Sequence, residues 1–542
     1  MNFSAFDRQG LLDEMAWETL DLLVIGGGIT GAGIAWDAAC RGLTVGLVEK
    51  GDFGEGTSSR STKLIHGGLR YLKQLEINLV REVGRERALL YERAPHLVIP
   101  APMLLPLYQG GTYGKLASSV GLWVYDRLAG VKKEERRRML SRQETMEREP
   151  LLTEKGLQGA GLYVEYRTDD ARLTLEVMKT AFTYGAKAVN YAEAVSFLYE
   201  DGRVVGAKVR DRVSGETRDI LAREVVNATG PWADELRKKD GSLQGKRLHL
   251  TKGVHLVVPY ERFPLRQPVY FDIPDGRMVF AIPRGRVTYV GTTDTDYDGS
   301  IDEPTMTVND RDYLLQGVND VFPTVDLKVE DVESGWAGLR PLIHEEGKSP
   351  SELSRKDEIF QSPSGLITIA GGKLTGFRKM AERVVDLVSE RLRDADGDMI
   401  RPCRTDQVEL ISGGSLGGEG FLHFRDEWKR RLTEVGMEAQ SAEALIHRYG
   451  LQIENVWERA NRQMNRLIQA EVDFAIEEEM AVYPSDVLIR RSGSLYFDRN
   501  HFQTIAPDVV KQMSERLGWD EEQKQQELKE LANEQTLTHP SI

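Results

Sequence analysis

The sequence predicts an α/β fold in three successive parts: a parallel sheet covered by helices, an antiparallel sheet, and a helical C-terminal region. Residues 21–48 have the strand–helix–strand pattern of a parallel βαβ unit. From about 160 to 330 the chain alternates apolar and polar residues in hairpin-like segments. Beyond about residue 400 the pattern becomes charged and helical. These three sequence patterns predict the fold class.

The βαβ unit comes first. A short buried strand, Asp-Leu-Leu-Val-Ile at 21–25, ends at three consecutive glycines. A helix rich in small residues is predicted at 29–41, and a second strand at 44–48. Strands joined through a helix lie parallel in one sheet, with the helix on its face.

Two hairpin-like segments follow. AVSFLYEDGRVVGAKVR contains an Asp201-Gly202 turn, and MVFAIPRGRVTYVGTTD contains Arg284-Gly285-Arg286 between two strands. We expect both in the antiparallel sheet. The segment REVVNATG, residues 223–230, is predicted to return the chain to the parallel sheet.

The last strand of the parallel sheet is predicted at 366–370, followed by a helix that runs to about Arg391. A loop near 394–418 leads into the helical region, and we place the domain boundary near 395–405. We therefore predict two domains, 1–399 and 400–542, since 542 residues are too many for one ordinary core.

Composition excludes several classes of protein. The chain is 40% hydrophobic and 29% charged, and it contains no apolar run long enough to span a membrane. Its amino terminus lacks a signal-peptide pattern, and two cysteines make a disulfide framework or a thiolate metal site unexpected, so we expect a cytoplasmic protein without a metal centre. A net charge of -14 argues against nucleic acid as a partner. Any anion site must be built from a local cluster of Arg and Lys.

A glycine motif, Gly26-x-Gly28-x-x-Gly31, lies between the first strand and the helix. Glycines there allow a tight turn, a close approach of a pyrophosphate, and packing of the helix on the strand. The pyrophosphate would then rest at the helix N-terminus. Glu49 ends the second strand and is placed to accept hydrogen bonds from a ribose, which disfavours NADP. We expect a dinucleotide site; the alternative is a glycine-rich turn of purely structural use.

Two later segments favour FAD over NAD. Residues 225–230 form an apolar strand that ends in small residues, and residues 371–375 are predicted to open another helix. A helix N-terminus stabilises negative charge, and a reduced flavin carries such charge on its pyrimidine ring. An ordinary sheet-to-helix turn is the alternative for either segment. The candidate cofactor contacts in these segments are Ala228, Gly230, Gly372, Lys373, Leu374 and Thr375.

The run TSSRSTKLIHGGLRYL, residues 57–72, resembles the FAD-dependent (aerobic, quinone-linked) glycerol-3-phosphate dehydrogenases. Further matching segments are DDARL (169–173), NATGPW (227–232), KGVH (252–255), GTTD (291–294), GLRPL (338–342) and GGKLT (371–375). The resemblance covers nearly the whole chain. One departure is Gly376-Phe377, where the family pattern has Thr-Tyr, so a hydroxyl contact to the flavin is not expected there.

The resemblance implies a fold and an activity. The fold is an FAD-binding Rossmann-like domain with an antiparallel β-sheet substrate-binding part, plus a C-terminal α-helical domain. The activity is oxidation of sn-glycerol 3-phosphate to dihydroxyacetone phosphate by hydride transfer from C2 to N5 of FAD. It further implies non-covalent FAD, a membrane quinone as acceptor and peripheral association with the inner face of the plasma membrane. We also expect a homo-oligomer.

The resemblance also assigns site residues. It adds Ser58, Ser59, Lys63, His66 and Gly67 to the cofactor contacts. Substrate phosphate is assigned to Arg340 and Arg355, because a guanidinium can give a phosphate two parallel hydrogen bonds.

The catalytic candidates are His255, Arg340, Lys373, Arg70 and Tyr71. His255 matches a substrate-site histidine of the family, and oxidation of an alcohol needs a base for the hydroxyl proton. His66 is a second candidate, with a hydrogen bond to the flavin as its other reading. Each candidate also has a structural alternative. Either histidine could be a strand residue whose hydrogen bonds are made within the protein, and Lys373 could be a solvated lysine at a helix start. Arg70 and Tyr71 could serve only to hold their loop.

Other functions remain open at this point. Within enzymes the alternatives are a glycerol-3-phosphate oxidase that uses oxygen and an amino-acid or amine oxidase on the same fold. A non-catalytic flavin-binding module is an alternative from another class. The segment DVLIRR, residues 486–491, resembles part of the family's helical domain, where Arg490 and Arg491 are expected to form structural ion pairs.

Overall fold

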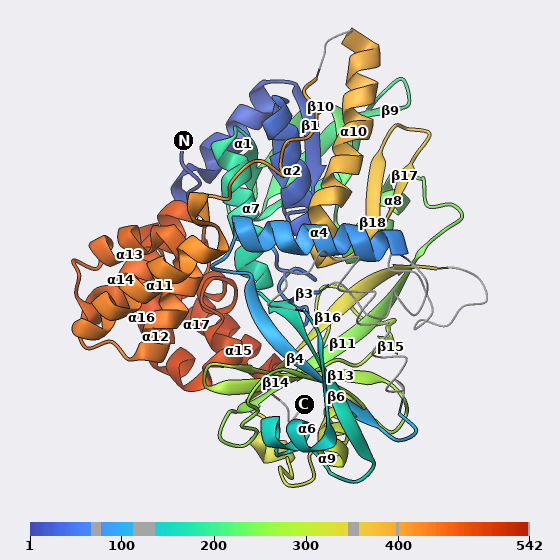
Figure 1. Cartoon of the computed structure of the whole chain (residues 1–542). Helices are drawn as coiled ribbons and strands as arrows, with labels where there is room; N and C mark the ends of the chain where they lie inside the picture. The colour runs from blue at the N-terminus through green and yellow to red at the C-terminus, as the bar shows by residue number, and fades with distance from the viewer. Residues whose placement is uncertain (67–76, 112–135, 345–356, 397–399, 540–542) are drawn as a thin grey trace.

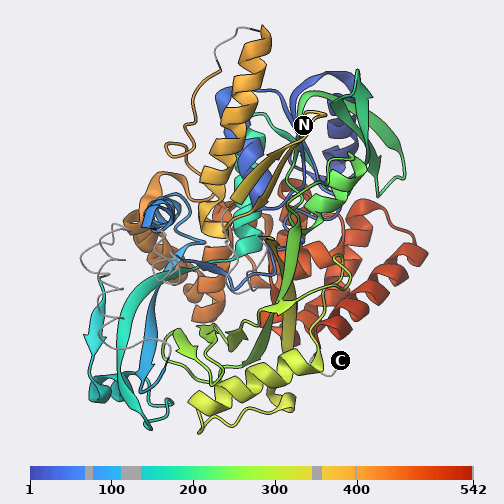
Figure 2. The same ribbon diagram turned by 90° about the vertical axis from the view of Figure 1, so that its right-hand side faces the viewer.

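The computed structural model describes residues 1–66, 77–111, 136–344, 357–396 and 400–539. Two sheets and a group of C-terminal helices make up the molecule (Figure 1). Helix α10, Phe377–Asp396, and helix α9, Val308–Val321, lie at opposite ends in both side views (Figures 1 and 2). The first sheet, which contains β1, β2 and β10, lies toward the α10 end, and the second sheet, which contains β11 and β16, lies toward the α9 end.

The first sheet has the strand order β17-β18-β10-β1-β2-β7, with β1 parallel to both β2 and β10. The bounds of its strands are β1 Leu20–Ile25, β2 Val45–Val48, β7 Lys187–Val189, β10 Thr217–Asn227, β17 Asp357–Gln361 and β18 Ile367–Gly371. Helix α2, Ile29–Arg41, connects β1 to β2 and ends at Gly42, which has a φ of 95°. The predicted βαβ unit is confirmed.

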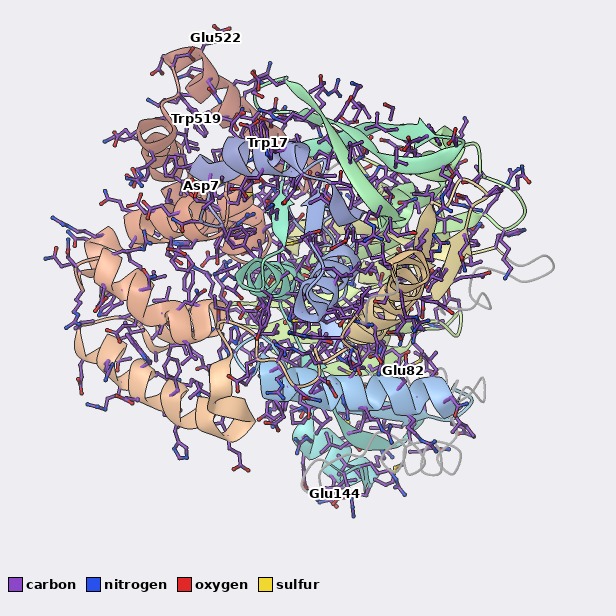
Figure 3. All side chains as sticks on the ribbon, turned by 90° about the horizontal axis from the view of Figure 1, so that it is seen from above. Asp7, Trp17, Glu82, Glu144, Trp519 and Glu522 are labelled. Atoms are coloured by element: carbon purple, nitrogen blue, oxygen red, sulfur yellow. The ribbon has the colours of Figure 1, made fainter. Side chains whose placement is uncertain are left out.

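Helices pack against this sheet. Helix α2 packs between α7, Asp170–Thr183, and α10. Helix α4, Ile77–Arg93, carries Glu82 and crosses the molecule in the view from above (Figure 3). Arg383 of α10 approaches Glu82 with an N–O distance of 3.3 Å.

The hairpin β8, Ala192–Glu200, and β9, Arg203–Asp211, lies elsewhere than predicted. Its Asp201-Gly202 turn is present, with φ values of 48° and 78°. However, β9 pairs with β10, so the hairpin extends the first sheet and does not belong to the second sheet, which is described next. Strand β10 makes this possible because its first half pairs antiparallel with β9 and its second half parallel with β1. A local hairpin pattern cannot indicate which sheet the hairpin joins.

The second sheet has the order β15-β11-β14-β13-β12-β4-β6-β3, with β16 beside β11 and β5 beside β6. The bounds of its strands are β3 Leu64–Ile65, β4 Ile99–Tyr108, β5 Arg138–Leu140, β6 Leu157–Arg167, β11 Leu248–Pro259, β12 Val269–Asp272, β13 Met278–Arg284, β14 Val287–Gly291, β15 Thr295–Asp296 and β16 Ser334–Ile343. Among its described strands, β12 and β4 pair in parallel and the other pairings are antiparallel. The predicted hairpin β13–β14 lies here, as expected.

The C-terminal region is helical, as predicted. Its α-helices are α11 Gly417–Glu434, α12 Ala439–Tyr449, α13 Ile453–Arg459, α14 Leu467–Glu478, α15 Ser494–Phe497, α16 Arg499–Leu517 and α17 Glu521–Leu537. The segment Asp486–Arg491 forms a π-helix. Among the helices that the structure describes, none combines the length and hydrophobicity that crossing a membrane requires.

A buried ion-pair cluster attaches this region to the first sheet. Asp52, in the loop after β2, accepts hydrogen bonds from Arg490 (2.5 Å) and Arg491. The two guanidinium groups lower the pKa of the Asp52 carboxyl against the opposing effect of its burial. Arg490 and Arg491 are thus structural ion-pair partners, as expected. Breaking such a pair leaves a buried charge uncompensated and costs about 3–5 kcal/mol.

Candidate active site and cofactor cavity

A cavity of about 770 Å³ lies at the carboxyl ends of β1, β2 and β10. In open parallel sheets, ligands bind outside these strand ends. The cavity walls come from all three parts of the chain, including Glu49 after β2, Trp336 of β16 and Tyr496 of the helical region. Its volume falls within the range of ordinary ligand pockets.

The glycine motif forms a cradle that a side chain would fill. Gly26 has a φ of 112°, and a Cβ there would lie 2.6 Å from the carbonyl oxygen of Ala228. A Cβ on Gly31 would overlap the carbonyl oxygen of Gly26, and one on Gly28 would lie 3.2 Å from Ser58 Oγ. Only glycine allows both the turn and the close packing of helix on strand, so this wall fits a dinucleotide.

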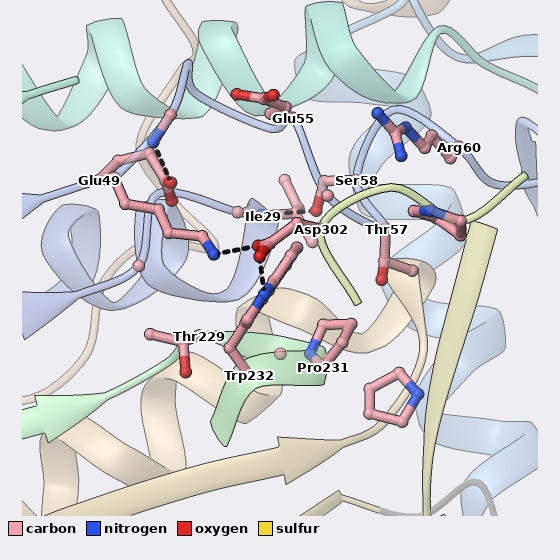
Figure 4. Close-up of a pocket in the computed structure, with 18 of the residues that line it drawn as sticks. Ile29, Glu49, Glu55, Thr57, Ser58, Arg60, Thr229, Pro231, Trp232 and Asp302 are labelled. Atoms are coloured by element: carbon pink, nitrogen blue, oxygen red, sulfur yellow. Dashed lines mark hydrogen bonds and ion pairs between the residues drawn. The ribbon is translucent and has the colours of Figure 1, made fainter. Parts of the chain in front are cut away.

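The N-terminus of α2 opens into the cavity beside Ser58. Ser58 Oγ accepts a hydrogen bond of 2.9 Å from the backbone N–H of Ile29, the first residue of the helix (Figure 4). The helix dipole favours negative charge at this point. Ser58 lines the cavity, so its assignment as a cofactor contact is consistent with its position.

Glu49 lies immediately after β2 and lines the cavity, as the sequence predicts. Its carboxylate accepts hydrogen bonds from the backbone N–H groups of Gly27 (2.6 Å) and Gly51 (2.8 Å). Burial raises the pKa of Glu49, and these two N–H groups oppose that effect. The carboxylate is therefore held in one orientation at the edge where a ribose would bind.

Five further residues predicted to contact the cofactor line the cavity: Ala228, Gly230, Gly372, Lys373 and Leu374. Gly230 and Gly372 have φ values of 56° and 85°, which glycine adopts readily.

The helix predicted to open at 371–375 starts differently in detail. A single 3₁₀ turn, Leu374–Gly376, precedes α10, and Lys373 is its N-terminal flanking residue. Thr375 is buried and donates a 3.2 Å hydrogen bond to the carbonyl oxygen of His66. Thr375 and His66 are not among the described residues that line the cavity.

Lys63 and Ser59 lie behind the cavity wall. Lys63 is buried, forms an ion pair with Asp170 and donates a 2.9 Å hydrogen bond to the backbone carbonyl of Ser59. Neither is among the described lining residues. In this structure both hold the loop that carries Ser58.

His255 lies on β11 and is 1% exposed. Its ring stacks on Trp336 at 4.7 Å between centroids, and its Nε2 lies 2.9 Å from Thr62 Oγ1. Burial lowers the pKa of His255 well below its usual value, and the positive charges of Arg340 and Lys63 lower it further. His255 is therefore neutral near pH 7. Trp336, its partner on the adjacent strand β16, lines the cavity, whereas His255 and Arg340 are not among the described lining residues.

Arg340 lies on β16 close to His255. Its guanidinium donates hydrogen bonds to Thr293 O (3.1 Å), Asp294 (3.1 Å) and Thr292 Oγ1 (2.9 Å). A Cβ on Gly253 would overlap this guanidinium, so the glycine leaves room for it. The second sheet thus brings Arg340 and His255 together, whereas Gly67, Arg70, Tyr71 and Arg355 lie outside the described residues.

Comparison with known proteins agrees with this geometry. Residues 21–379 match the family model "FAD dependent oxidoreductase", and residues 403–524 match "C-terminal domain of alpha-glycerophosphate oxidase". The aerobic glycerol-3-phosphate dehydrogenase of Bacillus subtilis is 52% identical over 549 residues, which cover 100% of this chain and 98% of the relative. That of Staphylococcus haemolyticus is 48% identical, over 98% of this chain and 97% of the relative.

The chain belongs to the aerobic glycerol-3-phosphate dehydrogenase family of FAD-dependent oxidoreductases. The crystal structure of glycerol-3-phosphate dehydrogenase from Bacillus halodurans complexed with FAD has a TM-score of 0.85 and 45% identity. The match covers 100% of this chain and 99% of the Bacillus halodurans chain. The predicted family, fold class, FAD cofactor and enzyme class are confirmed.

Several cavity residues of this family member were not expected from the sequence. Trp336 lies on β16, Asp302 lies in the loop between β15 and α9, and Glu534, Leu537 and Thr538 come from the end of α17. The backbone N–H of Gly335 donates a 2.9 Å hydrogen bond to Thr538 O, which fixes the end of α17 against β16. Residues 534–538 lie beyond both matched segments, and their helical pattern gave no signal of a cavity contact.

Proposed function

We propose that the chain oxidises sn-glycerol 3-phosphate to dihydroxyacetone phosphate and passes the electrons to a membrane quinone. The observation that carries this proposal is a cavity that fits FAD and is lined on one side by the second sheet, which carries a buried, neutral His255 and the Arg340 guanidinium. The relatives from Bacillus subtilis and Staphylococcus haemolyticus are named for the same substrate. When bound, FAD supplies an acceptor for the hydride that leaves C2 of the substrate.

We assign the hydroxyl proton to His255. A neutral imidazole has one accepting nitrogen, and the low pKa keeps His255 in this form at neutral pH. Nε2 is the nitrogen with a hydroxyl partner, Thr62, in the free enzyme. A substrate hydroxyl that takes the place of Thr62 would find an acceptor already oriented by the stack on Trp336.

We assign the substrate phosphate to Arg340, together with Arg355. The Arg340 guanidinium is already fixed in direction by Asp294 and Thr292, so little side-chain freedom is lost when an anion binds. Asp294 partly neutralises it, so a dianion needs a second cation, which is the role we give to Arg355. Lys373, at the cavity wall, is placed to act on substrate or reduced flavin.

The acceptor and the cellular setting follow from the same family. We propose a quinone acceptor, peripheral attachment at the inner face of the plasma membrane, a homo-oligomer and non-covalent FAD. A second candidate is an oxidase that passes electrons to oxygen, because residues 403–524 match a domain named for alpha-glycerophosphate oxidase. Acid precipitation tests the cofactor linkage: we expect the yellow colour in the supernatant, whereas colour in the pellet would show a covalent bond.

The deciding experiment is anaerobic addition of glycerol 3-phosphate to the yellow holoenzyme. We expect bleaching of the flavin with glycerol 3-phosphate and no bleaching with amino acids. Re-oxidation then separates the acceptors: a water-soluble quinone should restore the colour at once and air only slowly. Fast re-oxidation by air with release of hydrogen peroxide would favour the oxidase, and absence of bleaching would overturn the proposed function.

A further inference from the structure

The segment 297–307, between β15 and α9, crosses one side of the cavity mouth. Its first residue is tied to the second sheet by a 3.0 Å hydrogen bond from Tyr297 N to Leu250 O. Near its end, Lys252 Nζ donates a 3.2 Å hydrogen bond to Thr305 O. Residues 302–306 of this segment line the cavity. The segment is therefore fixed at both ends and reaches toward the first sheet at Asp302.

Asp302 joins two residues of the cofactor-binding part (Figure 4). Its Oδ1 accepts hydrogen bonds from Lys50 Nζ at 2.5 Å and from Trp232 Nε1 at 2.9 Å. The ammonium group of Lys50 also lies 4.2 Å from the centroid of the Trp232 ring. All three groups contact one another, so the loss of one group removes two of the three contacts.

The two partners of Asp302 flank the adenosine side of the cofactor site. Lys50 directly follows Glu49, and Trp232 ends the 3₁₀ turn that begins at Gly230. Lys50 follows β2 and Trp232 follows β10, the two strands on either side of β1, and in such a sheet a dinucleotide binds outside the carboxyl ends of the strands. The contact among Lys50, Trp232 and Asp302 thus spans the opening where the adenosine half of FAD would enter or leave.

We propose that Asp302, Lys50 and Trp232 form a clasp that retains FAD, and that the clasp must open for the cofactor to exchange. A loop attached to the second sheet thereby takes part in holding a cofactor whose other contacts come mainly from the first sheet. This inference depends on FAD binding alone, so its failure leaves the proposed substrate untouched.

The ion pair between Asp302 and Lys50 is exposed to solvent, as a contact that opens for cofactor exchange must be. The Asp302 side chain is 68% exposed and that of Lys50 is 35% exposed. Solvent-exposed ion pairs are weak and are screened by salt. The Asp52 cluster, whose carboxylate is 0% exposed, has the opposite character and fixes one part of the chain to another.

The test is the rate at which FAD leaves the holoenzyme, followed by the rise in flavin fluorescence after dilution. We expect Asp302→Ala to raise the dissociation rate constant about tenfold, and Lys50→Met and Trp232→Phe to raise it less. Asp302→Asn keeps an acceptor for Trp232 but loses the charge that attracts Lys50, so it should fall between wild type and Asp302→Ala. Added salt should speed release from wild type and leave Asp302→Ala nearly unchanged.

Asp275→Ala is the matched control. Asp275 is another exposed carboxylate of the second sheet that accepts hydrogen bonds from a cation, Arg277 (3.0 Å), and an aromatic residue, Tyr313 (2.9 Å). It is not among the described residues that line the cavity. Its variant should release FAD at the wild-type rate.

The thermal unfolding midpoint of each apoprotein shows whether a variant is folded. A folded Asp302→Ala apoprotein that rebinds FAD and releases it faster supports the clasp. Release within twofold of wild type, or equal acceleration in Asp275→Ala, would overturn it.

Discussion

The two walls of the cavity are built by different means. The first-sheet wall is made largely of backbone: Gly26, Gly28 and Gly31 leave the space, and the start of α2 supplies the dipole. The second-sheet wall depends on side chains from separate strands: Trp336 of β16 lines the cavity, and His255 of β11 stacks against it. A backbone site is encoded in one short segment, whereas a side-chain site exists only after the sheet has formed. The contrast also separates two tasks, holding a cofactor and oxidising a substrate.

Replacement of His255 should give the largest effect on chemistry with little effect on FAD. We expect His255→Ala to slow flavin reduction by glycerol 3-phosphate about 10²–10⁴-fold, the usual share of general-base catalysis. Stopped-flow absorbance under anaerobic conditions measures this rate. His255→Gln keeps a hydrogen-bonding shape and should restore substrate binding but not the rate. If both variants reduce flavin normally, the proton goes to His66, Lys373 or water.

Replacement of Glu49 should give the converse result. Glu49→Arg removes the acceptor for Gly27 and Gly51 and places a cation where a ribose hydroxyl needs an acceptor. FAD binding should weaken by about 2–4 kcal/mol, roughly the loss of a buried charge-assisted contact. The FAD dissociation constant of the apoprotein checks this value. Full flavin occupancy after purification would show that the assignment of Glu49 is wrong.

Replacement of Arg340 should affect substrate recognition and spare the flavin. Loss of hydrogen bonds to a charged group costs about 1.5–3 kcal/mol, so Arg340→Ala should raise KM for glycerol 3-phosphate by about 10- to 150-fold. Some loss of kcat is also expected, because phosphate binding contributes to positioning. Unphosphorylated glycerol is the control substrate. Equal proportional losses with both substrates would indicate a folding or flavin defect.

The sequence predicted the first wall better than the second, for physical reasons. A strand, a glycine turn and a helix are local, so residues 20–48 could be placed to within a residue or two. The sheet to which β8 and β9 belong depends on a long-range pairing with β10, and the prediction was wrong there. The stack of His255 on Trp336 is likewise a meeting of two strands that no local pattern specifies.

A change of pH near neutrality should give the smallest effect on the rate of flavin reduction, because His255 is already neutral there. Burial and the charges of Arg340 and Lys63 lower its pKa well below 6.5, so protonation, which inactivates the base, sets in only at low pH. Flavin reduction should therefore be flat from about pH 6.5 to 9 and fall below it. A bound phosphate dianion opposes this shift, so the acidic limb should move upward at saturating substrate. A limb centred above pH 7 in the free enzyme would contradict this.

The separation of the two tasks is tested most directly by measuring two quantities on two variants, Glu49→Gln and His255→Gln. The quantities are the FAD dissociation constant of the apoprotein and the rate of flavin reduction at saturating FAD and glycerol 3-phosphate. We predict that Glu49→Gln weakens FAD binding and reduces at nearly the wild-type rate once loaded, whereas His255→Gln binds FAD normally and reduces slowly. If both quantities change together in both variants, the two walls do not act separately and the account is wrong.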